Sequence, residues 1–310
     1  MKELIPLLSE AAKAYYQESR EIMSNFEYDR LYDELLKLEQ ETGTVFAGSP
    51  TQKGGYEILS ELPKERHERP MLSLNKTKSV DELREWLGNQ TGLLSWFTDI
   101  RMPKMDGLTV VLTYEDGVLA KAVTRGNGEI GEVITPNART FINIPTTIPY
   151  KGQLILRGEA VISYSDFEKL NDSIADVDAK YKNPRNLCSG SVRQLNSEIT
   201  ASRNVRFMAF ALVRAEGVDF KNSRKEQFLW LSGLGFETVE FVEVTAETLS
   251  GAVRRFAEKI EHYDIPSDGL VLLYDDIAYG QSLGRTAKFP RDSIAFKWAD
   301  EIQETTLSYI

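Results

Sequence analysis

The feature that most constrains the fold is a pair of short apolar runs behind the segment Lys104-Met105-Asp106-Gly107. Residues 108–114 and 118–124 are rich in Val, Thr, Leu and Ala, and Glu115-Asp116-Gly117 joins them. β-Branched residues favour strands, and Asp-Gly is typical of the turn in a β-hairpin. The pattern therefore predicts a hairpin directly after Gly107, with Lys104 on a sheet.

A second interpretation uses the same residues. The segment from Asp99 to Gly107 also resembles the phosphoacceptor loop of a response-regulator receiver, in which Asp99 would accept a phosphoryl group. That interpretation requires an amphipathic helix after Gly107 and an earlier strand that ends in two adjacent acids. The runs after Gly107 have strand character, and the region before Trp96 offers no such strand. The hairpin is therefore favoured.

The composition is that of an ordinary soluble protein, with 310 residues, 42% hydrophobic and 27% charged. That length allows two domains and a large core. One cysteine and two histidines argue against an intramolecular disulfide, a cysteine-based zinc cluster and a multi-histidine metal site. Without a signal-peptide pattern or a membrane-spanning run, the expected location is the cytoplasm, with no membrane partner.

Two domains are predicted, with a boundary in the Gly-, Ser- and Pro-rich stretch 42–55. Residues 1–42 have the periodicity of two helices, the second with a capping box at Ser24-Asn25-Phe26-Glu27. After residue 56 a capped helix is expected at Ser79. Strands are expected at 93–99, 108–114, 118–124, 153–162, 205–213, 236–243, 268–275 and 293–298, and helices at 165–172, 223–233 and 246–263. This mixed order predicts an α+β fold with largely antiparallel sheets.

The net charge of −10 opposes a simple DNA-coating role, because phosphate neutralisation needs a basic surface. One stretch, 182–206, carries Arg185, Arg193, Arg203 and Arg206 against the single acid Glu198. Charge alone allows either a solvated loop or a local basic groove at this place.

A series of motifs, taken in their order along the chain, resembles one family, the NAD+-dependent DNA ligases of bacteria. The resemblance covers nearly all of the chain. The motifs are Tyr15-Tyr16, Glu27-Tyr28-Asp29, Ser49-Pro50-Thr51-Gln52, Pro70-Met71-Leu72-Ser73-Leu74, Lys104-x-Asp106-Gly107, Thr124-Arg125-Gly126, Arg157-Gly158-Glu159, Asn183-Pro184-Arg185-Asn186, Gly190-Ser191-x-Arg193-Gln194-Leu195, Asp268-Gly269 and Pro290-Arg291 before Lys297. The resemblance implies a small helical NMN-binding domain (1–55) and a nucleotidyltransferase, or adenylation, domain (56–310) of mixed, largely antiparallel sheets with flanking helices.

The resemblance also implies a reaction and its catalytic residues. Lys104 would attack the α-phosphorus of NAD+, forming lysyl-AMP and releasing NMN. The amine must be neutral to attack, and because a free lysine has a pKa of about 10.4, burial or adjacent cations such as Lys297 and Arg125 would have to lower it. Asp106 would hold the loop and the sugar, or simply make the turn. Glu159 would face the ribose or a metal.

Further residues are implied in binding NAD+. Arg185 and Arg193 would lie near phosphates, and Ser73 and Leu74 would line the adenosine pocket, although Leu74 also fits a simple core role. The helical domain would contact NMN through Tyr15, Tyr16, Asn25, Tyr28 and Asp29. Mg2+ would clamp the pyrophosphate, with no ligand residue assigned.

The sequence departs from the family pattern at four positions. Asn25 stands where Asp is usual, Met102 where Glu is usual, Leu273 where Lys is usual and Asp292 where Trp is usual. In the family the Glu and the Lys both reach the adenine edge, and here both positions are apolar. We infer that the two changes are coupled, because losing one partner alone would leave a buried charge unpaired, at a cost of about 3–5 kcal/mol.

The predicted function is the first step of DNA nick sealing, self-adenylation from NAD+, by a monomer. The resemblance implies that family members continue into further domains, which are not expected within these 310 residues, and the full-length enzyme would seal nicked double-stranded DNA in replication and repair. One alternative is a divergent paralogue that binds nucleotide or DNA with weak or no ligase activity. Another is an ATP-dependent ligase or capping-type nucleotidyltransferase, against which the small domain with Tyr15 and Tyr28 argues.

Overall fold

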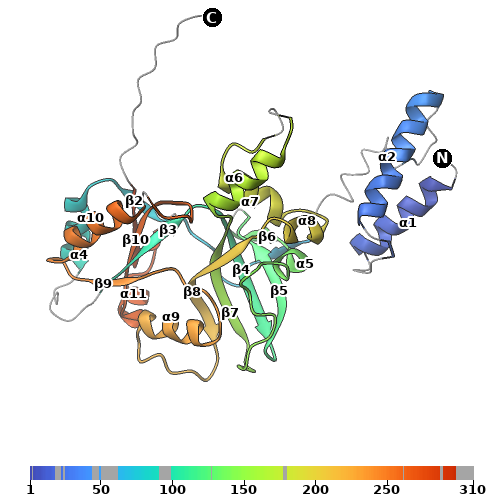
Figure 1. Ribbon diagram of the computed structural model, residues 1–310. Coiled ribbons are helices and arrows are strands. Elements are labelled where there is room, and N and C mark those ends of the chain that lie inside the picture. The colour runs from blue at the N-terminus through green and yellow to red at the C-terminus, as the bar shows by residue number, and fades with distance from the viewer. Residues whose placement is uncertain are drawn as a thin grey trace, which may run out of the picture.

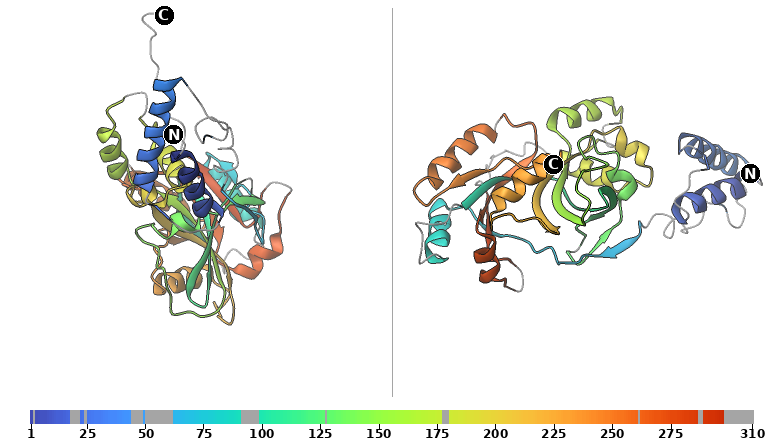
Figure 2. Two further views of the ribbon diagram at one scale, coloured as in Figure 1. Left: turned by 90° about the vertical axis from the view of Figure 1, so that its right-hand side faces the viewer. Right: turned by 90° about the horizontal axis from the view of Figure 1, so that it is seen from below.

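The computed structural model describes residues 1, 3–17, 22–23, 25–43, 49, 62–90, 99–126, 128–176, 180–260, 262–286 and 289–297 (Figure 1). The chain begins with helices α1 (Leu4–Gln17) and α2 (Asn25–Thr42), which contact each other and bury Leu8 and Leu35. The two helices predicted for residues 1–42 are thus confirmed, while the expected cap at Ser24 lies outside the described residues. Figure 1 and the right view of Figure 2 place this pair to one side of the larger β-rich part.

A four-stranded antiparallel sheet has the order β5-β4-β7-β8. Its strands are β4 (Leu108–Glu115), β5 (Val118–Thr124), β7 (Leu154–Val161) and β8 (Arg206–Ala215). Asp116 and Gly117 join β4 to β5 with positive φ of 50° and 78°, the conformation that a tight hairpin turn requires at both central residues. The predicted hairpin is confirmed, and the receiver interpretation is wrong because a strand, not a helix, follows Gly107.

A five-stranded sheet has the order β2-β11-β10-β3-β9, antiparallel except where β2 pairs with β11. Its strands are β2 (Asn75–Thr77), β3 (Asp99–Met105), β9 (Val242–Val244), β10 (Ser267–Tyr274) and β11 (Ser293–Lys297). Helices α4 (Val80–Gln90) and α10 (Leu249–Ile260) bury apolar side chains, such as Leu83 and Phe256, in one cluster with Leu270 and Leu272 of β10. The predicted cap of α4 is present, because Ser79 Oγ accepts from the Glu82 amide at 3.3 Å.

The strand that carries the motif lysine differs from the prediction. A strand was expected at 93–99, whereas β3 begins at Asp99 and runs through Lys104; residues 93–98 lie outside the described part. Pro103 is tolerated there because β9 pairs with β3 only as far as Arg101, so that beyond Arg101 no described strand pairs with this edge of β3. The strand expected at 236–243 is likewise wrong in extent, since only Val242–Val244 pairs as β9.

The two sheets face each other across an apolar cluster. Met102, Val271 and Leu273 of the five-stranded sheet pack in it with Val161 and Met208 of the four-stranded sheet. Within each sheet, a glycine permits close approach of neighbouring backbone segments. A Cβ atom on Gly107 would lie 2.0 Å from the Ala160 carbonyl oxygen, and one on Gly269 would lie 2.1 Å from that of Phe296. Lys104 of β3 and Gly107 before β4 lie where the chain passes from the five-stranded sheet to the four-stranded sheet.

Short helices and a small sheet complete the fold. The predicted helices at 165–172 and 223–233 are confirmed as α6 (Tyr164–Ser173) and α9 (Arg224–Gly233). The other elements are β1 (Lys64–Arg66), β6 (Ile130–Glu132), α5 (Thr135–Ala138), α7 (Pro184–Val192), α8 (Ser197–Ala201) and α11 (Ile277–Leu283). None of the helices in the described chain is long and apolar enough to cross a membrane.

The basic stretch 182–206 is not a solvated loop. Asn183 caps α7 by accepting from the Asn186 amide, and Pro184 begins the helix, where its missing N–H costs nothing. Leu187, Cys188 and Val192 are buried in the core against the four-stranded sheet. Of the four arginines, Arg185 lies within α7, Arg193 follows α7, Arg203 follows α8, and Arg206 is the first residue of β8.

Candidate active site

Two lysines from neighbouring strands share one carboxylate at the junction of the sheets. Lys104 of β3 and Lys297 of β11 both lie opposite Gly269 of β10. Residues directly opposite on adjacent strands project to the same face, so the two amines converge. The Nζ atom of each lies 2.7 Å from an oxygen of Asp268. The sequence prediction that the fold brings Lys297 close to Lys104 is confirmed.

Asp268 is the site residue that sequence reasoning missed. The motif Asp268-Gly269 is visible in the sequence, but the sequence alone assigns no role to its aspartate. A register shift in β10 between Ser267 and Gly269 interrupts the alternation of faces, which lets this carboxylate reach both lysines. Burial raises the pKa of Asp268 and hydrogen bonds from the two lysines lower it, leaving it below the ordinary value. The carboxylate thus offsets the mutual repulsion of the two ammonium groups.

Glu159 lies on β7 directly opposite Thr109 of β4, and the Thr109 hydroxyl donates to its Oε2 at 2.8 Å. Burial raises the pKa of Glu159 to about 7, against the opposing effects of Thr109, Lys104 and Arg185. This carboxyl group is therefore poised to change its charge near neutral pH and belongs to the same electrostatic cluster as Lys104.

Asp106 and Arg185 form an ion pair beside the lysines. Arg185 extends from the first turn of α7, and its Nη1 lies 2.5 Å from Asp106 Oδ1. Arg193, at the C-terminal end of the same helix, is engaged elsewhere, because its Nε lies 2.8 Å from Glu132 Oε2. The structure therefore brings Asp106 and Arg185 into the cluster, whereas Arg193 has a separate partner.

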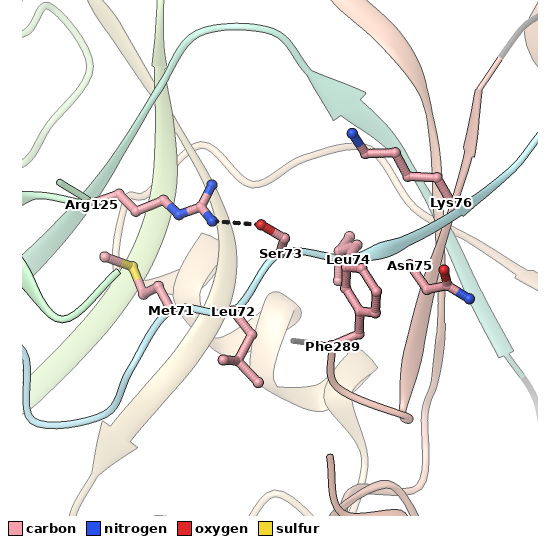
Figure 3. A pocket seen from close by; sticks show the side chains of 8 residues that line it. All are labelled: Met71, Leu72, Ser73, Leu74, Asn75, Lys76, Arg125 and Phe289. Carbon is pink, nitrogen blue, oxygen red and sulfur yellow. Dashed lines mark hydrogen bonds between the residues drawn. The ribbon is translucent and has the colours of Figure 1, made fainter. Parts of the chain in front are cut away.

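A pocket of about 570 Å³ is lined by the segment before and within β2, by Arg125 and by Phe289 (Figure 3). The Arg125 guanidinium faces the Ser73 hydroxyl and donates to it at 3.0 Å. Leu74 lines the pocket and also packs against the apolar cluster between the sheets. Ser73 and Leu74 thus line one pocket. Arg125, which the sequence predicts to lie close to Lys104, lines this pocket instead, and Lys104 is not among the lining residues.

The predicted NMN-binding residues are placed only by their helices. Two lie on α1 and three on α2: Tyr15, Tyr16, Asn25, Tyr28 and Asp29. Their side chains lie outside the described part of the chain. Their role in binding NMN stays a prediction.

Met102 and Leu273, two of the unusual positions, lie in the apolar cluster between the sheets and are only 6% and 5% exposed. In the register of the sheet Met102 pairs with Val271, so Leu273 is its diagonal neighbour on the same face. A single Glu or Lys at either place would therefore be surrounded by apolar side chains. This geometry supports the inference that the two changes are coupled.

Asp292, a third unusual position, has its own partner in this chain. Its Oδ2 lies 2.6 Å from Arg224 Nη2, and the Arg224 Nε donates to the Tyr274 carbonyl at 3.0 Å. The two side chains are 22% and 20% exposed. This ion pair ties the start of α9 to the strands β10 and β11.

We expect Asp292→Ala to lower the free energy of unfolding by about 1–3 kcal/mol, because it leaves a mostly buried guanidinium without its acceptor. Arg224→Met alone should lose a similar amount, and adding it to Asp292→Ala should cost little more. Urea denaturation of the four proteins of this cycle measures the coupling. Additive losses would contradict the pairing.

Comparison with known proteins identifies two regions. A family model described as the NAD-dependent DNA ligase adenylation domain matches residues 59–301, and one described as the DNA ligase-like, N-terminal NAD+-binding domain matches residues 1–55. Curated proteins named DNA ligase from Ruminiclostridium cellulolyticum and Lachnoclostridium phytofermentans are each 65% identical to this chain, over 99% of its length and 46% of theirs. One from Campylobacter concisus is 36% identical over 96% of this chain and 46% of its own. The chain thus spans about half the length of the curated relatives it matches.

Proposed function

The chain belongs to the NAD-dependent DNA ligase family, and on that premise we propose that it transfers AMP from NAD+ to its own Lys104. The observation that carries the proposal is the convergence of Lys104, Lys297 and Asp268 with Glu159 and Arg185 at one junction. Such a cluster offers a nucleophile together with cations for a diphosphate.

In the proposed step, the lone pair of the Lys104 amine forms a P–N bond to the α-phosphorus while the bond from that phosphorus to the bridging oxygen breaks. NMN leaves with the electron pair on its phosphate oxygen, and the proton that the Lys104 nitrogen loses passes to water. The Lys104 amine must break its ion pair with Asp268 before it can attack. An incoming phosphate would compete with the Asp268 carboxylate for Lys297. Lys297 and Arg185 would then hold the equatorial oxygens, where charge develops. Arg125 and Ser73 would hold the nucleoside at the pocket.

The residues present also fit Mg2+. The described residues include no group of three metal-capable side chains. Mg2+ nevertheless keeps several waters and is commonly held by one or two carboxylates with substrate phosphates. Glu159 and Asp106 are the carboxylates on this cluster that would hold the ion, which would offset charge on the diphosphate when bound.

We place the domain boundary between residues 55 and 56, with α1 and α2 closing over NMN to align the leaving group, a positioning role. In a full-length enzyme the AMP would pass to a 5′-phosphate at a nick in double-stranded DNA. The chain is expected to act as a monomer in the cytoplasm.

Incubating the chain with Mg2+ and either NAD+ or ATP, followed by intact-mass measurement under denaturing conditions, tests the function. We expect a gain of one AMP from NAD+ and none from ATP. A gain from ATP would instead indicate an ATP-dependent nucleotidyltransferase. A gain from neither nucleotide would indicate a protein that binds nucleotide or DNA without adenylating itself.

The apolar pair Met102 and Leu273 predicts weak selection for adenine. A site built around hydrogen bonds to a substrate rejects an analogue that lacks them by about 10⁴-fold, whereas an apolar pocket discriminates by far less. Isothermal titration should therefore give dissociation constants for NAD+ and its hypoxanthine analogue within about tenfold of each other. Submicromolar binding of NAD+ with strict rejection of the analogue would contradict this.

The double variant Met102→Glu with Leu273→Lys is the matched control for base selection. It restores both polar groups together, and we expect its selectivity for adenine to exceed that of the original chain. Each single variant should lose about 3–5 kcal/mol of stability, because its buried charge has no partner.

A further inference from the structure

Three arginines lie along the segment from Arg69 to Ser73, namely Arg69 itself, Arg125 and Arg157. None of them forms an ion pair with a described residue. Arg157 Nη2 donates to the Arg69 carbonyl at 2.8 Å, and Arg125 Nη2 donates to the Ser73 hydroxyl at 3.0 Å (Figure 3). The nearby acids are engaged by other cations, Glu65 by Lys121 and Glu68 by Arg214. These three guanidinium groups form a strip of positive charge in a chain whose net charge is −10.

Arg157 is the least expected of the three. It lies on β7 two residues before Glu159, so both side chains project from the same face of the sheet. Its Nε is buried and has no hydrogen-bond partner among the described residues. Burial, and secondly the charge of Arg69, lower the pKa of the Arg157 guanidinium. A charge held in this way destabilises the fold unless an anion accompanies it during function.

The strip continues directly from the pocket. Met71 and Arg125 line the pocket, and Met71 is two residues from Arg69, which is exposed. A ligand that extends from the nucleotide site along the segment 73 to 69 would therefore meet Arg125 and then Arg157 and Arg69. Forked guanidinium donors match the paired oxygens of a phosphate group, and successive phosphates with one charge each match a row of separate arginines.

We propose that Arg69 and Arg157 bind phosphodiester groups of the DNA strand that lies beside the reacting phosphate. This inference rests on the proposed function, because it supplies the nucleic acid for which the adenylated chain would be used. These contacts position the strand and carry no sequence information, since they reach only its backbone. Arg157 is then retained for binding, at a cost to stability, rather than for folding.

The alternative role for Arg157 is structural, as a tether for the backbone at Arg69. The two roles predict opposite effects on stability. If the arginine serves binding, Arg157→Met should leave the melting temperature equal or raise it, because an apolar side chain of similar length replaces an unpaired buried charge. If it serves as a tether, the same variant should melt at a lower temperature.

The test measures binding of a fluorescently labelled nicked duplex to the 310-residue chain by anisotropy at several salt concentrations. Arg157→Met and Arg69→Met should each weaken binding about 3- to 10-fold and reduce the slope of log K against log salt by about one. Arg69→Met removes only an exposed charge and keeps the backbone carbonyl that Arg157 contacts. The control is Arg254→Met, an exposed position on α10 that should bind like the original chain.

Several results would overturn the proposal. They are unchanged binding in both variants, a lowered melting temperature of Arg157→Met with an unchanged salt slope, or no measurable duplex binding by the original chain at low salt. Inorganic phosphate at matched ionic strength distinguishes a site for the DNA backbone from a site for a free anion. If it protects the original chain from melting as well as the duplex does, the site takes a free anion and the backbone assignment is wrong. AMP transfer from NAD+ to the original chain, measured on the same sample, tests the proposed function separately.

Discussion

Replacing Lys104 by alanine is expected to abolish the gain of one AMP from NAD+, a loss on the order of 1000-fold or more. The amines of Lys104 and Lys297 share the Asp268 carboxylate. Of the two, Lys104 lies on β3, just before the close contact of Gly107 with Ala160. Intact-mass spectra recorded over time measure the loss directly.

Lys104→Arg is the matched variant for this experiment. Arginine keeps a positive charge for Asp268 and so preserves the local fold, but it is not deprotonated in proteins and cannot attack. We expect it to be as inactive as Lys104→Ala while melting like the original chain. Lys121→Ala, which removes a lysine paired with Glu65 on another strand, should retain full activity. Adduct formation by either Lys104 variant would show that another residue is the nucleophile.

The second large effect is expected at Glu159. Burial raises the pKa of Glu159 to about 7 from its ordinary value of 4.5, so folding favours the protonated carboxyl group. Below about pH 4.5 the group is protonated in both states and costs nothing, whereas above pH 7 the folded protein must hold the buried charge. Stability from this group therefore falls as pH rises from about 4.5 to 7, by up to about 3 kcal/mol.

Glu159→Gln removes this dependence while keeping the shape of the side chain and an oxygen for Thr109. The variant should therefore be more stable than the original chain at pH 8, by up to about 3 kcal/mol, and the difference should shrink toward pH 5. Guanidinium denaturation at pH 5, 6, 7 and 8 measures it. A difference that is constant with pH, or of opposite sign, would contradict the assigned burial of this charge.

The same variant should lose AMP transfer, because the carboxylate faces the cluster that holds Lys104. Greater stability with lower activity is the expected signature of a site in which a buried charge serves chemistry rather than folding. We expect the rate of AMP transfer to fall at least tenfold at pH 8. A variant that is more stable and fully active would remove Glu159 from the catalytic set.

Local sequence patterns predicted those parts of the fold that depend on neighbouring residues. The hairpin after Gly107 was predictable because Asp116 and Gly117 tolerate positive φ, and α6 and α9 because each begins at a capping serine, Ser163 or Ser223. The strand β3 was placed too early because Pro103 and Lys104 have weak strand propensity, which pairing with β10 overrides.

In the candidate site, too, local motifs were predictable and long-range pairing was not. Ordered motifs identified Lys104, Asp106, Glu159, Arg185 and Lys297, and the structure brings all five together. Asp268 could not be assigned, because its position between two lysines depends on the order of β11, β10 and β3 and on an irregularity in β10. The ion pairs Arg193 with Glu132 and Arg224 with Asp292 join residues far apart in the chain and have no local signal.

The most direct test of the central claim is a crystal structure of this chain with NAD+ and Mg2+ bound. We predict that Lys104 Nζ leaves Asp268 and lies roughly 3–3.5 Å from the α-phosphorus, on the side opposite the NMN leaving group, as in-line attack requires. A structure in which NAD+ is bound while the Lys104 amine remains in solvent, far from any phosphate, in every arrangement of the two domains would contradict the account.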